Sequence, residues 1–130
     1  IHPEGIYHLL TRVYNDYHPA HLFVTENGVC VPDGIDFDGR VRDYRRIRYL
    51  HDHLVQLQRV IHDGVPVEGY FHWSLMDNFE WAYGYRMRFG LIHVDFETQK
   101  RTLKDSGAWY ANLIHYNGVD LKPLDWNEFH

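Results

Sequence analysis

Glu26 is the first residue whose surroundings suggest chemistry. It ends a short run of apolar, strand-forming residues, His21 to Glu26, and the turn pair Asn27-Gly28 follows it. α/β barrels place their catalytic groups at the carboxyl ends of parallel strands, which is where this carboxylate falls. A charged residue at a strand end is also common where solvent begins. From its position alone, Glu26 is either a catalytic carboxylate or a turn residue.

A second candidate site lies between Tyr70 and Gly90, where aromatic residues are interleaved with polar ones. The polar members are Asp77, Asn78, Glu80, Arg86 and Arg88. Sugars have apolar C–H faces and a rim of hydroxyls, so their sites combine flat aromatic rings with carboxylates, amides and indole N–H groups. Two carboxylates in such a pocket suit the cleavage of a glycosidic bond. The other interpretation is a loop that folds over its own aromatic core.

The elements that must position these residues follow from hydrophobic periodicity. We expect, in order, a helix over about 3–17, a buried strand over 21–26, a loop over 29–42, a helix from Asp43 to 63–64, a strand over 65–75, an aromatic loop over 76–90, an extended piece over 91–94 and a helix over 104–116. This alternation predicts an α/β fold with parallel strands and crossover helices. Because a (β/α)₈ barrel needs about 250 residues, the chain provides at most a few of its units.

Two of the predicted helices show candidate packing faces. The apolar stripe of the second helix consists of Ile47, Leu50, Leu54, Leu57 and Ile61. One side of the last helix consists of Ala108, Ala111, Ile114 and His115. Five arginines between Arg40 and Arg48 are interpreted as the solvated face of the second helix, balanced by Asp36, Asp38 and Asp43.

Composition argues against several classes of function. The 130 residues hold 13 Lys+Arg against 18 Asp+Glu, a net charge of −5, which argues against nucleic acid or an anionic membrane as a partner. No apolar run is long enough to span a membrane. Cys30 is the only cysteine, so we expect a packed or loop thiol and no internal disulfide. The 11 histidines show no metal-ligand spacing, so we expect surface histidines and neither a metal nor a cofactor.

Four motifs stand in order along the chain. They are Thr-Glu-Asn-Gly at 25–28, the run from Val41 to Leu54, Tyr-Phe-His-Trp-Ser-Leu-Met-Asp-Asn-Phe-Glu-Trp-Ala-Tyr-Gly-Tyr at 70–85, and Arg-Phe-Gly-Leu-Ile-His-Val-Asp at 88–95. Their order and spacing resemble glycoside hydrolase family 1, the β-glucosidase family. The resemblance implies that residues 1–130 are the C-terminal segment of a single TIM (β/α)₈ barrel catalytic domain, incomplete on its own. That segment holds about the last two βα units plus a preceding helix.

The resemblance also implies roles for individual residues. Glu26 matches the nucleophile of a retaining mechanism, and Trp73 matches the aromatic platform under the sugar. Glu80 and Trp81 match the pair that hydrogen-bonds the outer hydroxyls, and Phe89 lines the same pocket, whereas Asn27 and Asn78 are weaker candidates. Family members that act on 6-phosphorylated sugars carry small polar and basic residues in place of Glu80 and Trp81. We therefore expect an unphosphorylated β-glucoside or related β-glycoside as substrate.

One catalytic group of the family is missing from this chain. The family's general acid/base lies in a Thr-x-Asn-Glu-Pro motif, whereas the Asn127-Glu128 pair here is followed by Phe129. Retaining geometry needs two carboxyls about 5–5.5 Å apart. We therefore expect a complementary N-terminal barrel fragment, present as a second chain, to supply the acid/base glutamate. The first residue is Ile1 and not Met, which we interpret as a cut.

The alternative hypothesis is a non-catalytic fragment or engineered scaffold of the same fold. Its aromatic loop would bind sugar without turnover, or hold haem or a metal opportunistically. The single cysteine and the lack of a leader-like start favour a cytoplasmic enzyme, although a cut at the N-terminus would hide a leader.

Overall fold

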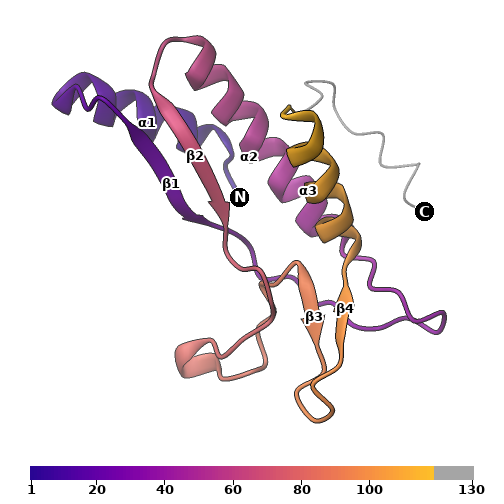
Figure 1. Ribbon diagram of the computed structural model, residues 1–130. Helices are drawn as coiled ribbons and strands as arrows, with labels where there is room; N and C mark the ends of the chain where they lie inside the picture. The colour runs from indigo at the N-terminus through magenta and orange to yellow at the C-terminus, as the bar shows by residue number, and fades with distance from the viewer. Residues whose placement is uncertain (119–130) are drawn as a thin grey trace.

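The computed structural model describes residues 1–118 (Figure 1). Its elements in chain order are α1 (Glu4–Tyr17), β1 (Leu22–Asn27), α2 (Tyr44–His62), β2 (Val67–His72), the short 3-10 helix η1 (Trp81–Tyr83), β3 (Ile92–Val94), β4 (Arg101–Leu103) and α3 (Asp105–Tyr116). The three predicted helices and the two main strands are confirmed, although β2 is shorter than the predicted strand over 65–75. The Asn127-Glu128 pair lies outside the described residues.

β1 and β2 form a parallel sheet, and the helices pack on one of its faces (Figure 1). Leu22 lies opposite Val67 in the register, and both contribute to the core. Side chains alternate between the two faces of a strand, so Val24 follows Leu22 into the same layer. The core residues of α2 are Leu50, Leu54, Leu57 and Val60, and Leu10 of α1 joins them. α2 is therefore the central helix, because it contacts both α1 and α3.

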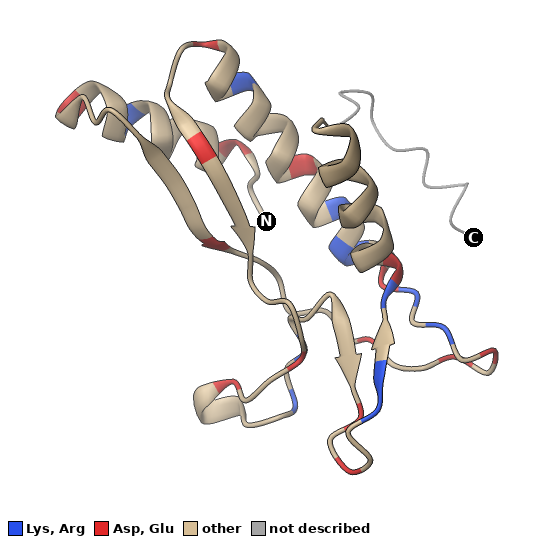
Figure 2. Cartoon of the chain, in the orientation of Figure 1, with Lys and Arg blue, Asp and Glu red and all other residues tan. Residues whose placement is uncertain are grey.

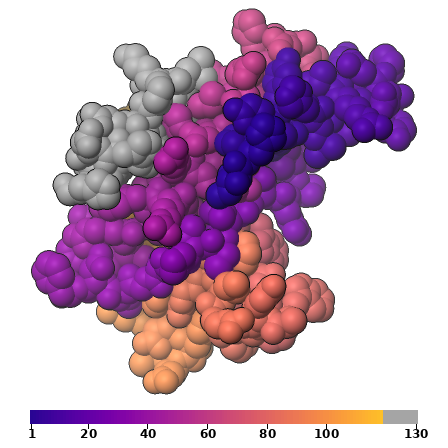
Figure 3. All heavy atoms as spheres, turned by 180° about the vertical axis from the view of Figure 1, so that it is seen from behind, coloured from indigo at the N-terminus to yellow at the C-terminus, as the bar shows by residue number. Residues whose placement is uncertain are grey.

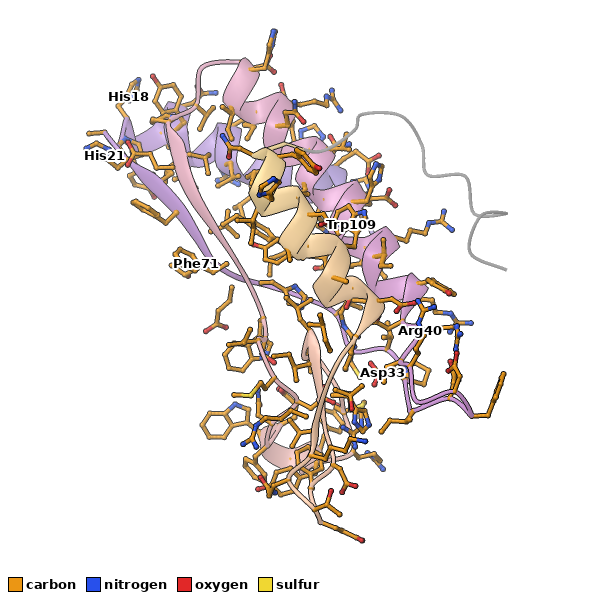
Figure 4. The ribbon with its side chains drawn as sticks, turned by 45° about the vertical axis from the view of Figure 1, so that its right-hand side comes forward. His18, His21, Asp33, Arg40, Phe71 and Trp109 are labelled. Carbon is orange, nitrogen blue, oxygen red and sulfur yellow. The ribbon has the colours of Figure 1, made fainter. Side chains whose placement is uncertain are left out.

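The other face of the β1–β2 sheet is bare. Phe23 of β1 is 52% exposed and Phe71 of β2 is 58% exposed. Figure 4 shows Phe71 on the side of β2 that faces away from the helices. Within residues 1–118 each of these strands also pairs with only one neighbour. The described residues thus form a partial α/β arrangement with an uncovered apolar face, and two strands do not close a barrel.

The chain after β2 builds a second, smaller sheet. β3 and β4 are antiparallel, with Ile92 opposite Leu103, and Met76 forms an isolated parallel bridge with Ile92. The sequence predicted β3 as an extended piece over 91–94 but missed β4, because a three-residue strand is too short to show alternation. In Figure 3 the residues coloured orange, which include the aromatic loop and this hairpin, form one end of the molecule.

Two predicted packing faces need correction. In α2 the apolar stripe holds through Leu57, but Ile61 is 46% exposed and Val60 is fully buried in its place. In α3 the buried residues are Ser106 and Gly107, while Ile114 is exposed. Trp109, Tyr110 and Leu113 pack against the core instead of the predicted side. A Cβ atom on Gly107 would lie 2.7 Å from the carbonyl oxygen of Leu91, so glycine allows this end of α3 to approach that backbone closely.

The helices of residues 1–118 include none that is both long enough and apolar enough to cross a membrane.

Candidate active site

Glu26 lies near the carboxyl end of β1, where Figure 2 shows the strand's acidic position in red. Its side chain is exposed, unlike those of Leu22 and Val24 earlier in the strand. Within residues 1–118 its carboxylate accepts no hydrogen bond and forms no ion pair. A free carboxylate at the end of a parallel strand is available to a ligand, whereas a carboxylate used as a cap would be occupied.

Asn27, the next residue, is locked by two tyrosines. Its amide nitrogen donates to the Tyr49 hydroxyl at 3.0 Å, and the Tyr70 hydroxyl donates to its amide oxygen at 2.8 Å. Tyr49 belongs to α2 and Tyr70 to β2, so this chain of hydrogen bonds ties the end of β1 to both neighbours. Burial raises the pKa of both tyrosines, so both hydroxyls stay protonated at neutral pH. Asn27 thus positions the strand end that carries Glu26.

Trp73 is brought against the same strand end by a close backbone approach. Its N–H donates to the carbonyl oxygen of Asn27 at 3.0 Å. A Cβ atom on Gly28 would lie 1.8 Å from the carbonyl oxygen of Trp73, so only glycine fits at position 28. Trp73 is 38% exposed. The structure therefore places Glu26 and Trp73 on adjacent strand ends, although they are 47 residues apart in sequence.

Glu80 and Trp81 lie on the loop that protrudes below the β1–β2 sheet in Figure 1. A tight turn closes this loop, since the Glu80 N–H donates to the carbonyl oxygen of Gly84 at 2.7 Å. Glu80 is half-buried and Trp81 is 81% exposed. Phe89 is half-buried, and its carbonyl oxygen accepts from the N–H of Ser74 at 3.2 Å. Phe89 is thus anchored beside Trp73, whereas Glu80 and Trp81 stand further out on the loop.

Of the five predicted site residues Glu26, Trp73, Glu80, Trp81 and Phe89, one lines the open cavity beside the aromatic loop. This cavity has a volume of about 620 Å³ and includes Trp73 but none of Glu26, Glu80, Trp81 and Phe89. Its other lining residues are Ser74, Leu75, Met76, Asp77, Asn78, Phe79, Tyr85, Val94, Phe96, Gln99 and Arg101. The predicted site residues thus do not all line this one cavity.

Sequence reasoning missed a group of connected charged residues beneath the aromatic loop, which we call the buried charge cluster. Its members are Asp33, Asp43, Arg46, Asp77, Arg88 and Lys104. All of their side chains except that of Arg88 are at most 1% exposed. The three carboxylates balance the three cations, as buried charges require. The cluster connects the 29–42 loop, α2, the aromatic loop and the start of α3.

The cluster corrects two predictions. Arg46 does not lie on a solvated face, because it is fully buried and binds Asp33 and Asp43. The expected balance with acidic residues does hold for Arg42, which is paired with Asp36 and Asp38. Asp77 is likewise not one of the polar groups that face a ligand. Its pairing was not visible in the sequence, because its partner Lys104 is 27 residues away.

Electrostatics at the cluster favours the ionised carboxylate of Asp77. Burial alone would raise the pKa of this carboxyl, but the hydrogen bonds from Lys104 and Arg88 outweigh burial and lower the pKa below its usual value.

Nearby, burial lowers the pKa of His72 to about 4, so this ring is neutral at physiological pH. Its Nε2 atom donates to the carbonyl oxygen of Phe89 at 3.2 Å.

The expectation of surface histidines is wrong for His51, His53 and His93, which are all buried. Ring contacts accompany this burial; His53, for example, stacks on Tyr49 with ring centroids 3.9 Å apart. In the part of the chain that the structure describes, no three His, Cys, Asp or Glu residues converge to hold a metal ion.

Cys30 is a half-buried thiol whose sulfur lies 3.3 Å from that of Met87.

Comparison with known proteins establishes the family. The sequence model of glycosyl hydrolase family 1 matches residues 1–119. β-Glucosidase A of Thermotoga maritima is 52% identical over 118 residues, which cover 91% of this chain and 26% of the relative. A bifunctional β-D-glucosidase/β-D-fucosidase of Bifidobacterium breve is 49% identical over 118 residues, covering 88% of this chain and 26% of the relative. The chain belongs to glycosyl hydrolase family 1, as its motifs predicted.

Solved structures agree with this assignment. The family 1 β-glucosidase from Thermotoga maritima superimposes with a TM-score of 0.91 at 52% identity, covering 92% of this chain and 27% of that one. The same enzyme has been solved in complex with isofagomine lactam and with glucoimidazole. This chain thus has the fold of a segment of a family 1 β-glucosidase. It spans about a quarter of the length of the curated relatives it matches.

Proposed function

We propose that residues 1–130 form the C-terminal segment of a single (β/α)₈ barrel that hydrolyses β-glycosidic bonds with retention. The observation that carries this proposal is the free, exposed carboxylate of Glu26, which stands at a parallel strand end beside Trp73. Membership of glycosyl hydrolase family 1 supports hydrolysis of the β-glucosidase type. Because the matched part covers only 26% of the relative, we assign the activity to the completed barrel.

In this proposal Glu26 is the nucleophile. Its ionised carboxylate attacks the anomeric carbon and forms a glycosyl ester, while the bond from that carbon to the leaving-group oxygen breaks. A second carboxyl group, about 5–5.5 Å away, protonates the leaving oxygen and later removes a proton from water, which releases the sugar with retained configuration. Within residues 1–118 the Glu26 carboxylate makes no contact with another carboxyl group. We infer that the preceding part of the barrel supplies this second group.

The sugar would lie against Trp73, with its outer hydroxyls at Glu80 and Trp81. The indole ring offers an apolar face, the Glu80 carboxylate accepts hydrogen bonds and the Trp81 indole N–H donates one. Phe89, anchored through its carbonyl oxygen, completes this wall. A carboxylate at position 80 would repel a phosphate, so the proposed substrate is an unphosphorylated β-glucoside. The glucoside-like inhibitors bound by the Thermotoga maritima relative support this class.

The remaining part of the barrel would cover the bare face of the sheet. Phe23 and Phe71 expose apolar rings there, and the outer edges of β1 and β2 lack partners within the described residues. An exposed apolar face beside open strand edges is typical of an element removed from a larger core. We propose that the rest of the barrel, joined to this chain or present as a separate chain, pairs with these edges.

The test is to produce this chain together with the remaining three quarters of Thermotoga maritima β-glucosidase A. Assembly is followed by size-exclusion chromatography, and hydrolysis is followed with an aryl β-glucoside. Glu26→Gln should assemble normally and lose hydrolysis by on the order of 10⁴-fold or more, as expected for removal of a nucleophile. Glu97→Gln, which changes an exposed carboxylate in the β3–β4 turn, serves as the matched control and should keep full activity.

Persistent hydrolysis by the Glu26→Gln assembly would refute the nucleophile assignment. An assembly that binds glucoimidazole but hydrolyses no aryl glycoside, with Glu26 intact, would instead support the alternative of a sugar-binding scaffold.

A further inference from the structure

We propose that Asp77 is a positioning residue for the sugar site, because it closes the base of the loop that carries Glu80 and Trp81. The inference rests on the proposed function, which gives Glu80 and Trp81 their contact with the sugar. Asp77 itself does not touch substrate, since its side chain is fully buried. Its role is to fix where the loop stands.

The Asp77 carboxylate binds both ends of the loop. Asp77 begins the loop, and its Oδ1 accepts from the N–H of Gly90, at the loop's end, at 3.0 Å. Its Oδ2 accepts from the Arg88 guanidinium at 2.5 Å and from the N–H of Val94 at 3.4 Å. The backbone repeats the closure, because the Asp77 N–H donates to the carbonyl oxygen of Ile92 at 3.0 Å. The Asp77 side chain therefore binds three residues that lie 11 to 17 positions further along the chain.

The closed base is also attached to the helices. Lys104, which precedes α3, donates to Asp77 Oδ1 at 2.9 Å and to Asp33 Oδ2 at 2.7 Å. Asp33 in turn pairs with Arg46 of α2 at 2.8 Å. These groups are buried away from water, and an unpaired charge is costly in such a place. The loop base therefore has one stable arrangement, in which every charge is paired.

Beyond its base, the loop has few contacts with the rest of the described residues; one joins the sulfur atoms of Met87 and Cys30, 3.3 Å apart. Within the described residues, the backbone N–H groups from Phe79 to Met87 donate only to carbonyl oxygens inside the loop, as in the Glu80–Gly84 turn. The rings of Tyr85 and Phe96 touch, with centroids 4.5 Å apart, and this contact lies on the hairpin side of the loop. The position of Glu80 and Trp81 relative to Trp73 is thus set mainly at the base.

The experiment uses the assembled barrel and two aryl substrates, a β-glucoside and a β-xyloside, which lacks the hydroxymethyl group. Glu80→Gln should reduce the preference for the glucoside, because it weakens a contact to the outer hydroxyls. Asp77→Asn has nearly the same size but loses acceptors for Lys104 and Arg88. It should reduce the same preference, with a loss in kcat/KM for the glucoside of up to on the order of 10²-fold, the scale of a 1 Å misplacement.

Two comparisons separate positioning from general damage. If Asp77 acts through Glu80, the two substitutions should not add. The glucoside preference of the double variant Asp77→Asn/Glu80→Gln should then be at least as high as that of the single variant with the lower preference. The matched control is Asp43→Asn, which also removes a buried carboxylate of the cluster but pairs with Arg46 and Ser106 and not with Asp77, Arg88 or Lys104, so it should leave the preference unchanged. Equal losses on both substrates, additive losses in the double variant, or a preference change in Asp43→Asn would overturn the proposal.

A third variant keeps the test decisive if Asp77→Asn does not fold. Arg88→Met removes the guanidinium, which donates to Asp77 and lies over the Phe96 ring, but keeps an unbranched apolar side chain at a site that is partly exposed. It should shift the preference in the same direction by a smaller factor, and an unchanged preference would overturn the proposal. Failure of the proposed function is recognised separately, because Glu26→Gln would then remain active or Glu80→Gln would leave the substrate preference intact.

Discussion

Acidification should destabilise the site through His72, the last residue of β2. Its Nε2 donates to the carbonyl oxygen of Phe89, and its buried Nδ1 has no hydrogen-bond partner among the described residues. Burial lowers the pKa of this imidazole from 6.5 to about 4. The folded protein therefore keeps His72 neutral at a pH where the unfolded chain already binds a proton.

The size and sign of the effect follow from this difference. Above about pH 6.5 His72 is neutral in both states and does not change the unfolding free energy. As the pH falls toward about 4, the unfolded chain binds a proton that the folded protein does not, so the unfolding free energy decreases; below about pH 4 the effect is constant. A pKa difference of roughly 2.5 units corresponds to about 3 kcal/mol of unfolding free energy lost over this range. The loss falls on the segment that holds Trp73 and Phe89.

The assay compares urea unfolding of the assembled barrel at pH 7.5 and at pH 4, with and without His72→Gln. Glutamine keeps an N–H donor for Phe89 but does not ionise, so the drop in stability should be about 2–3 kcal/mol smaller in the variant. The pKa values of His53 and His93 are also lowered by burial, but they are common to both proteins and cancel. An equal drop in both proteins, or an NMR titration of His72 near pH 6.5, would refute the reasoning.

Two further predictions concern the packing around the site. Gly28→Ala would place a Cβ atom 1.8 Å from the carbonyl oxygen of Trp73, so we expect the two strand ends to separate and kcat/KM for an aryl β-glucoside to fall by on the order of 10²-fold; an unchanged rate would contradict this. Lys104→Met leaves Asp33 and Asp77 short of a cation and should cost about 3–5 kcal/mol in urea unfolding at pH 7. Because Lys104 helps to lower the pKa of Asp77, this cost should shrink below about pH 4, and a pH-independent cost would exclude the mechanism.

Local sequence patterns predicted the elements that depend on neighbours along the chain. The helical spacing of apolar residues identified α1 and α2, and the apolar run before Asn27 identified β1. β4 escaped prediction because its pairing with β3, and not its own composition, makes it a strand. Ile61 was misplaced because Val60, three residues after Leu57, faces the core in the last turn of α2, and periodicity alone does not decide between the third and the fourth residue.

The sequence by itself determined the family and the candidate residues, because the family's motifs are runs of neighbouring residues in a fixed order. Such runs can be recognised without knowing the fold. Only the tertiary structure decided how these residues are supported. Asp77 was one polar residue in an aromatic segment until folding brought Lys104 to it, and Gly28 acquired its role only where Trp73 approaches. The bare faces of Phe23 and Phe71 likewise became visible only in the sheet. The physical reason is the same in each case: hydrogen bonds and contacts depend on distances in space, and periodicity reports only distances along the chain.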